Sequence, residues 1–238
     1  MRWTARLGAV TADALAVRLD ATVASARARL RGAERAGLLG CHRPLAGQPP
    51  LYTATAAGVR ACGERDLQPC RVSASGARHL IVCSHVAAAL ERCYPDHALL
   101  GERELRRAER VHGRPLASAR IGWRHGGDAG VHRPDLVLLP QRVPDGLPVA
   151  VEVELTVKAP RRLHDICLAW ARAGCVAGVL YLAPADVRRA LARAVRSAAA
   201  GERIAVLGLD AVPGLCADGA LDRARSLARR HQTVPSAA

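Results

Sequence analysis

Carboxylates accompany two neighbouring apolar segments in the middle of the chain. Asp135 follows Pro134 and directly precedes a run of branched residues, Leu136–Leu139. A segment rich in turn residues separates this run from residues 149–157, in which apolar and polar residues alternate strictly. Side chains of a β-strand point alternately to its two faces, so this pattern predicts a strand with one apolar and one polar face. The apolar positions are Val149, Val151, Val153, Leu155 and Val157, and the polar positions are Glu152, Glu154, Thr156 and Lys158.

The polar face of this predicted strand carries an unusual set of charges. Glu152 and Glu154 lie about 7 Å apart along a strand, where two carboxylates repel each other unless a cation offsets them. Lys158 is the only lysine in the chain, in which arginine otherwise supplies the strongly basic side chains. This choice indicates a need for a compact ammonium group on this face. The alternative is an ordinary half-exposed strand whose polar face contacts only solvent.

The same residues resemble the PD-(D/E)XK nuclease superfamily. Pro134-Asp135 is similar to the first element of its motif and Glu152 to the second, which implies that the two carboxylates hold a divalent metal ion, Mg²⁺ or Mn²⁺. In that superfamily a lysine two residues after the glutamate assists the attacking water, but here Glu154 takes that position and Lys158 lies four residues further on. Four residues of strand span about 13 Å. Either Glu154 takes the third role, or Lys158 bends back where the strand ends, or the site is degenerate.

A second resemblance covers most of the chain. The segments HRPDLVLL and VAVEVELTVKAPRRL are similar to the replication-relaxation family of actinobacterial plasmids and integrative elements. An apolar helix and a short acidic segment of that family resemble HLIVCSHVAAALE and GERELRR. The resemblance implies an N-terminal winged helix followed by a domain of restriction-endonuclease type, and a function in contact with DNA.

Residues 1–63 are predicted to form a winged helix-turn-helix DNA-binding domain. The second helix of this domain ends at Gly37, because glycine readily adopts the left-handed conformation that follows many helices. Residues 38–41 and 51–53 are the expected wing strands. Three threonines are placed to cap the expected helices at their N-termini: Thr11, Thr22 and Thr55.

The helix predicted from Val23 to Gly37 is expected to enter a groove of DNA. Small residues at the centre of its outer face allow a close approach, and arginines at the sides reach phosphates or guanine edges. The residues expected to contact nucleic acid are Ser25, Arg29, Arg31 and Arg35 of this helix and His42 and Arg43 of the wing. The alternative is a winged helix that contacts only protein.

Residues 64–77 lack periodicity and contain proline, serine and glycine, which predicts a linker. Residues 78–219 are predicted to form the nuclease-like domain, and residues 220–238 a basic C-terminal tail. The elements expected between them are a helix at 78–93, a loop or edge strand at 120–133, the two acidic strands, a helix from Pro160, an apolar strand at 175–182, a helix at 186–199 and a strand at 204–209. This order fits a restriction-endonuclease-like α/β core with a central mixed sheet.

Further charged residues are expected near the nuclease site. Glu102 is a candidate additional metal ligand, and its alternative is a helix face of ion pairs. His132 and Arg133 stand beside the first carboxylate and either contact phosphate or balance the acids. Arg161 and Arg162 open the helix after the acidic strand and are expected to contact nucleic acid.

The net charge of +14 suits a polyanionic partner, most simply nucleic acid. The chain has no apolar run of about 20 residues, and MRWTARLGAV is too short and too polar for a signal peptide. The eight cysteines lack zinc-finger spacing. We therefore expect a cytoplasmic protein that binds double-stranded DNA and no membrane, either as a monomer or as a homodimer.

Two functions are consistent with these residues. The first is a metal-dependent DNA endonuclease, in which Asp135 and Glu152 bind Mg²⁺ or Mn²⁺ and Glu154 or Lys158 orients or deprotonates the attacking water. The second is a non-catalytic DNA-binding regulator or replication accessory protein of a plasmid or integrative element, whose nuclease-like domain only dimerises or holds DNA. An adaptor that binds only proteins explains the positive charge least well.

Overall fold

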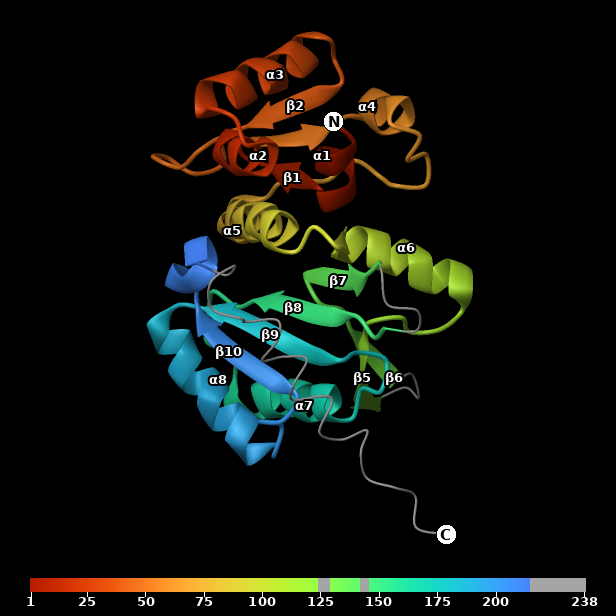
Figure 1. Ribbon diagram of the computed structural model, residues 1–238, viewed down its shortest axis with the longest axis vertical. Coiled ribbons are helices and arrows are strands. Elements are labelled where there is room, and N and C mark those ends of the chain that lie inside the picture. The colour runs from red at the N-terminus through yellow and green to blue at the C-terminus, as the bar shows by residue number, and fades with distance from the viewer. Residues whose placement is uncertain (124–128, 142–145, 215–238) are drawn as a thin grey trace. The chain divides into compact units, whose positions relative to one another are not determined.

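The computed structural model describes residues 1–123, 129–141 and 146–214 and has a mixed α/β fold (Figure 1). The chain divides into two compact units, each described separately below. The N-terminal unit contains residues 1–95 and 99–111, and the C-terminal unit contains residues 96–98 and the described residues from His112 onwards. Residues 64–95 and 99–111 thus belong to the N-terminal unit, and the domain boundaries expected at residues 63 and 77 stay predictions. The basic tail predicted at 220–238 lies outside the described residues.

The N-terminal unit begins with four helices and a small sheet. Its antiparallel strands have the order β1-β3-β2, and helix α2 packs against α3. The elements are α1 (Arg2–Leu7), β1 (Ala9–Val10), α2 (Ala12–Leu19), α3 (Val23–Arg35), β2 (Leu39–His42), β3 (Leu51–Ala54) and α4 (Ala56–Ala61). Helix α1 and strand β1 were not expected from the sequence, because α1 is only six residues long and has no side-chain cap.

The predicted helix caps of this unit are confirmed. Each threonine hydroxyl accepts a hydrogen bond from the backbone N–H three residues later, at 3.1 Å for Thr11, 3.2 Å for Thr22 and 3.1 Å for Thr55. Helix α2 ends at Asp20, whose φ is 50°, and α3 is followed by Gly37, whose φ is 69°. These short-range signals set where the helices begin and end.

Two longer helices complete the N-terminal unit. They are α5 (Ala74–Cys93) and α6 (Glu102–His112), the last residue of which lies in the other unit. Helix α5 starts four residues before the predicted helix, because the Ser73 hydroxyl caps it by accepting the N–H of Gly76 at 3.1 Å. The predicted linker is correspondingly shorter. Ala77 and Ile81 of α5 join the buried apolar cluster of this unit.

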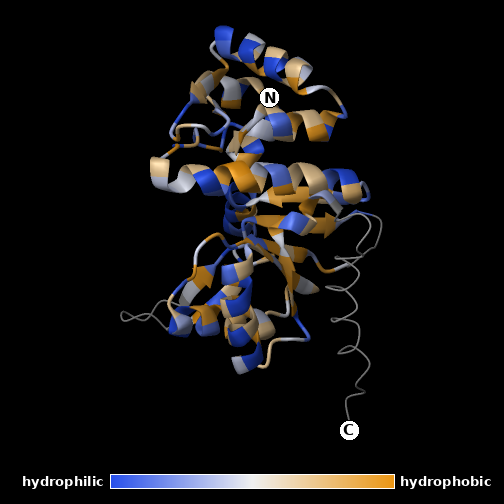
Figure 2. Ribbon diagram, turned by 90° about the vertical axis from the view of Figure 1, so that its left-hand side faces the viewer, coloured by the Kyte–Doolittle hydropathy of each residue, from blue (hydrophilic) through white to orange (hydrophobic). Residues whose placement is uncertain are grey.

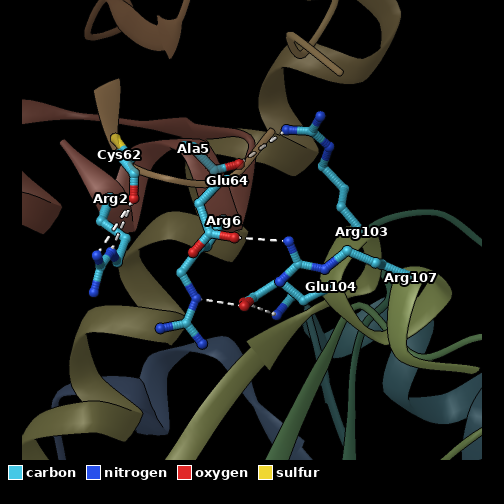
Figure 3. Close-up of polar contacts among 9 residues, drawn as sticks. Arg2, Ala5, Arg6, Cys62, Glu64, Arg103, Glu104 and Arg107 are labelled. Carbon is cyan, nitrogen blue, oxygen red and sulfur yellow. Dashed lines mark hydrogen bonds and ion pairs between the residues drawn. The ribbon is translucent and has the colours of Figure 1, made fainter. Parts of the chain in front are cut away.

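Polar contacts connect α6 to distant parts of the same unit (Figure 3). The Arg103 guanidinium donates to the backbone carbonyl of Ala5 at 3.1 Å. Arg107 forms an ion pair with Glu64, just after α4, at 2.7 Å. These contacts bring together segments separated by 43 and 98 residues in the sequence.

The strands of the C-terminal unit belong to a mixed five-stranded sheet with the order β10-β9-β8-β7-β4, and of β4 only His97 and Ala98 lie in this unit. Strands β7 and β8 are antiparallel, whereas β8, β9 and β10 run parallel, so the predicted mixed sheet is confirmed. The elements are β4 (His97–Gly101), β5 (Ala119–Trp123), β6 (Ala129–His132), β7 (Leu136–Pro140), β8 (Val149–Val153), α7 (Pro160–Ala171), β9 (Gly178–Ala183), α8 (Ala185–Ser197), β10 (Ile204–Gly208) and a final 3₁₀ helix (Leu209–Gly214). Strand β4 was not expected, and the region predicted as a loop or edge strand forms the antiparallel pair β5 and β6.

Hydrophobic residues are concentrated in the strands of this sheet, whereas hydrophobic and hydrophilic residues alternate along the helices (Figure 2). All five residues of β8 and all six of β9 are buried. Helix α7 turns Leu163, Ile166 and Trp170 inward, as its spacing predicted, and packs against α8. Burial of continuous apolar runs on both faces is typical of parallel strands inside an α/β fold.

The strand predicted at residues 149–157 is too long. Strand β8 ends at Val153, and Val157, expected on the buried face, is 55% exposed. The neighbouring strands explain this end. In the register of β7, Pro134 would face Val153, and Pro184 directly follows β9; neither proline has an N–H to extend the ladder. Pro160 then opens α7, so the chain must turn in between.

Among the described residues, no helix is both long enough and apolar enough to cross a membrane.

Candidate functional site

The antiparallel register of β7 and β8 places Asp135 beside Glu152. Leu136 pairs with Val151, and the next pair in this register is Asp135 and Glu152. Asp135 Oδ2 also accepts the backbone N–H of Val153 at 2.8 Å. This hydrogen bond gives the Val153 N–H an acceptor and holds the Asp135 carboxylate at the end of β8.

Glu152 is a buried carboxylate with a histidine partner. The residue is only 7% exposed, and its Oε1 lies 2.6 Å from Nε2 of His132. Burial raises the pKa of Glu152, and the nearby charge of Asp135 raises it further, while His132 and Lys158 oppose this shift. The alternative in which the polar face of this strand is merely solvated is therefore wrong.

His132 contacts one of the acids, which is one of the two roles that the sequence indicated for it. It ends β6, and its ring meets the Trp170 ring of α7 edge to face, with centroids 5.7 Å apart. The sequence places it three residues before Asp135, where it was expected either to contact phosphate or to balance the acids. The contact with Glu152 joins residues 20 positions apart on different sheets.

Lys158 returns to the carboxylates after β8 ends. Its ammonium forms an ion pair with Glu154, which is itself 7% exposed. Burial lowers the pKa of Lys158, and the charges of Glu152 and Asp135 oppose that shift. Lys158 therefore bends back toward Glu154 after the strand ends, and which group takes the third motif position stays a prediction.

Helix α7 and strand β9 enclose the carboxylates with weakly polar side chains. Tyr181 faces Glu152 in the parallel register of β8 and β9. Burial raises the pKa of Tyr181 well above its usual value and that of the Cys167 thiol to about 11, with the charge of Glu152 adding to both shifts. Electrostatic interactions are strong in such surroundings because little water screens them.

Two exposed arginines stand at the start of α7, near this cluster. Arg161 and Arg162 line a cavity of about 300 Å³ together with Ile121 and Asp165. The positive charge of Arg162 contributes to the lowered pKa of Lys158, after burial. The nucleic-acid contacts expected of Arg161 and Arg162 stay predictions.

Glu102 belongs to the N-terminal unit, at the start of α6. Its carboxylate forms an ion pair with Arg106 one helical turn later. This is the helix-face pairing that was the alternative to metal binding, and a ligand role for Glu102 stays a prediction.

The residues expected to contact DNA are mostly exposed on the N-terminal unit. His42 is half-buried, and its Nε2 contacts the Thr53 hydroxyl at 2.9 Å, so its imidazole already has a partner within the β2–β3 pair. Ser25 is half-buried in the first turn of α3. The exposed members are Arg29, Arg31 and Arg35 of α3, and Arg43 just after β2.

The chemistry of the site suits a hard divalent cation. Asp135 and Glu152 offer carboxylate oxygens, the ligands that Mg²⁺ and Mn²⁺ prefer, and their mutual repulsion would be relieved by a bound cation. Both carboxylates already have a partner, because Asp135 accepts the N–H of Val153 and Glu152 contacts His132. A cation would have to share Glu152 with the imidazole or displace it.

No protein-family model matches the chain, nor does any curated protein or solved structure.

Proposed function

We propose that the chain is a DNA-binding protein whose C-terminal unit is a metal-dependent DNA endonuclease. The observation that carries this proposal is that Asp135 and Glu152 lie side by side at the end of an antiparallel strand pair. Lys158 bends back toward these carboxylates after the strand ends. A buried glutamate beside a half-buried aspartate is costly for folding unless the pair serves binding or chemistry.

The order of the elements supports the two domain types proposed for the chain. In the C-terminal unit, an antiparallel pair (β7, β8) is followed by α7 and a parallel strand (β9), which is the arrangement expected of a restriction-endonuclease-like core. In the N-terminal unit, the sequence of a short strand, two packed helices and the antiparallel pair β2–β3 supports a winged helix. Helix α3 would then be the helix that enters the DNA groove.

Each residue of the site has a role in phosphodiester hydrolysis. Asp135 and Glu152 would hold Mg²⁺ or Mn²⁺, which supplies Lewis-acid stabilisation of charge on the phosphate. Burial lowers the pKa of Lys158, which eases loss of its proton and suits a group that orients or deprotonates the attacking water. Glu154 positions that ammonium through their ion pair. The water forms a new P–O bond, and the bond to the leaving oxygen of the DNA backbone breaks.

Conversion of supercoiled plasmid to nicked or linear DNA tests the proposal. Wild-type protein should cleave with Mn²⁺ or Mg²⁺ and stop when EDTA is added. Glu152→Gln should abolish cleavage, whereas Asp186→Asn, which neutralises an exposed carboxylate at the start of α8, should cleave like wild type. Cleavage that survives Glu152→Gln would show that the activity belongs to another site or to a contaminant.

A non-catalytic DNA-binding regulator is the second candidate. It is favoured by the partners that the catalytic groups already have, since His132 contacts Glu152 and Glu154 pairs with Lys158. The E-x-E departure from the nuclease motif agrees with this reading. Tight binding of duplex DNA without cleavage in either metal would make it the better assignment.

A further inference from the structure

A cavity in the N-terminal unit has a strongly cationic lining. Its volume is about 330 Å³, and helices α1, α2 and α3 contribute most of its walls. No acidic side chain from the described part of the chain lines it. Its polar lining includes four arginines: Arg2, Arg6, Arg18 and Arg29.

Three of these arginines are held in place by other parts of the same unit. Arg2 donates from Nε and Nη2 to the carbonyl of Cys62, at 3.4 and 3.3 Å, and Arg6 pairs through Nε with Glu104 (Figure 3). Burial raises the pKa of Glu104, and the charge of Arg6 opposes the shift. These contacts order the side chains before any ligand arrives, which lowers the entropic cost of binding.

Arg18 is held in a similar way from the other side of the cavity. Its Nε contacts the carboxylate of Glu91, and its guanidinium carbon lies 5.2 Å from the centre of the Trp3 ring. A guanidinium has five N–H donors, so contacts through Nε leave the donors of the terminal nitrogens for a further partner.

Arg29 differs from the other three arginines. It is exposed on α3, and within the described residues it has neither a hydrogen bond nor an ion pair. Its charge is therefore not balanced by a local carboxylate. The next residue, Leu30, is buried and, with Leu15 and Leu19, gives the cavity an apolar side.

We propose that this cavity binds a small molecule that carries phosphate groups. Arginine forks match the geometry of phosphate oxygens, and the four guanidiniums exceed the two carboxylates that pair with them, which favours a group with more than one negative charge. The leucines on the other side suit the carbon skeleton of such a ligand. A volume near 300 Å³ is at the small end of the range for ligand sites. The site requires neither the carboxylates nor the metal of the proposed nuclease.

Binding at this cavity would also oppose binding of DNA. Arg29 is one of the residues expected to contact the DNA backbone, and one guanidinium cannot satisfy both phosphates at once. Because the backbone of DNA offers the same chemistry, the cavity could instead receive a backbone phosphate, and the experiment must separate the two sources.

Isothermal titration of the full chain with inorganic diphosphate, without added metal, tests the proposal. Wild-type protein should bind one diphosphate per chain. Arg29→Gln should weaken binding about tenfold or more, because it removes a charged hydrogen-bond donor. Arg27→Gln removes the same charge from an exposed site on the same helix outside the cavity and should bind like wild type. Ala33→Met should also weaken binding, because it fills the cavity without a change of charge.

The proposal is overturned if no saturable binding occurs up to millimolar diphosphate, or if Arg27→Gln and Arg29→Gln weaken binding equally. It is also overturned if Ala33→Met, folded as judged by its thermal melt, weakens binding of duplex DNA but not of diphosphate, because the cavity then receives the DNA backbone. Diphosphate binding by a protein that fails to bind duplex DNA would support the cavity and contradict the proposed function.

Discussion

The fold places the carboxylates of Asp135 and Glu152 next to each other. The β7–β8 register sets them side by side, and both burial and the charge of Asp135 raise the pKa of Glu152, because each disfavours its charged form. His132 and Lys158 offset part of that cost. The metal that we propose for the site would offset this cost more fully, so a bound metal should raise the stability of the protein.

Asp135→Asn should separate metal binding from folding. Asparagine keeps an oxygen that can accept the N–H of Val153, so the fold should survive, and loss of one negative charge should raise the melting temperature without metal by about 2 °C. Wild type should gain stability with millimolar Mn²⁺, and the variant should lose that gain because one carboxylate holds the metal poorly. Thermal melts of both proteins with and without Mn²⁺ measure these effects.

Asp186→Asn serves as the control for this experiment, since it neutralises an exposed carboxylate and should keep the Mn²⁺-dependent shift of the wild type. A wild type without any Mn²⁺ shift, combined with an Asp135→Asn variant that melts lower, would show that Asp135 is only structural. The nuclease assignment would then fail.

His85 should make the stability of the N-terminal unit depend on pH. Its Nε2 contacts the Thr11 hydroxyl at 3.0 Å, and burial lowers the pKa of His85 below its ordinary value of 6.5. The folded state therefore favours the neutral imidazole, and its contribution to stability is complete above pH 6.5 and is lost as the pH falls from there toward the folded pKa. His85→Gln should remove this contribution, because glutamine does not titrate.

Chemical denaturation of wild type and His85→Gln between pH 7.5 and pH 5.5 measures that difference, since the other titrating groups are common to both proteins. The free energy of unfolding of the wild type should fall relative to that of the variant on acidification. Parallel curves would contradict a buried, neutral His85.

Helix α4 lies closer to the backbone of Leu38, just before β2, than a side chain would allow. The Thr55 N–H and hydroxyl both contact the carbonyl of Leu38, and they draw the first turn of α4 onto that carbonyl. A Cβ atom at Gly58 would overlap the Leu38 oxygen. Glycine is needed here for close approach of two backbones and not for an unusual φ.

Gly58→Ala should destabilise the protein by about 2 kcal/mol, because the helix or the strand must shift to make room. Gly32→Ala is the matched control: a Cβ there meets no atom within 4 Å, and alanine in the helix should instead stabilise by about 0.5 to 1 kcal/mol. Denaturant melts of the two variants should therefore move in opposite directions. Equal shifts would contradict the close contact at Gly58.

The whole chain carries a net charge of +14, which the proposed DNA-binding function uses. Arg29, Arg31 and Arg35 add exposed positive charge along α3, and Arg161 and Arg162 do so at the start of α7. Affinity for a polyanion of this kind comes largely from release of counterions and therefore depends on salt.

Binding of duplex DNA should weaken steeply as salt increases. A plot of the logarithm of the binding constant against the logarithm of the salt concentration should have a slope of about −5 if roughly six phosphates are neutralised. The double variant Arg29→Ala with Arg31→Ala should lose about 1 kcal/mol or more per residue and flatten the slope. The control double variant, Arg193→Ala with Arg196→Ala, removes the same charge from the exposed face of α8 and should change less. Fluorescence anisotropy over a salt series measures both, and equal losses in the two double variants would exclude α3 as the DNA contact.

Much of this architecture is encoded in short-range signals. Threonine caps, Gly37 and the spacing of apolar residues located α2, α3, α4 and α7, because each acts within a turn or two of helix. The continuous apolar run near Cys175 predicted a central strand, and β9 is that strand. The pairing of Asp135 with Glu152 was also predictable, since Asp135 directly precedes one strand and Glu152 lies in the next.

What the sequence could not determine depends on contacts between distant residues. The contact of His132 with Glu152, the return of Lys158 and the early end of β8 follow from neighbouring strands and from prolines that cannot extend a ladder. The cationic cavity collects arginines from three helices whose packing no local pattern reports. Local hydrogen bonds and periodicity therefore determined which elements form, and only the tertiary structure decided which charged groups share a buried environment, because the cost of burial arises from everything packed around them.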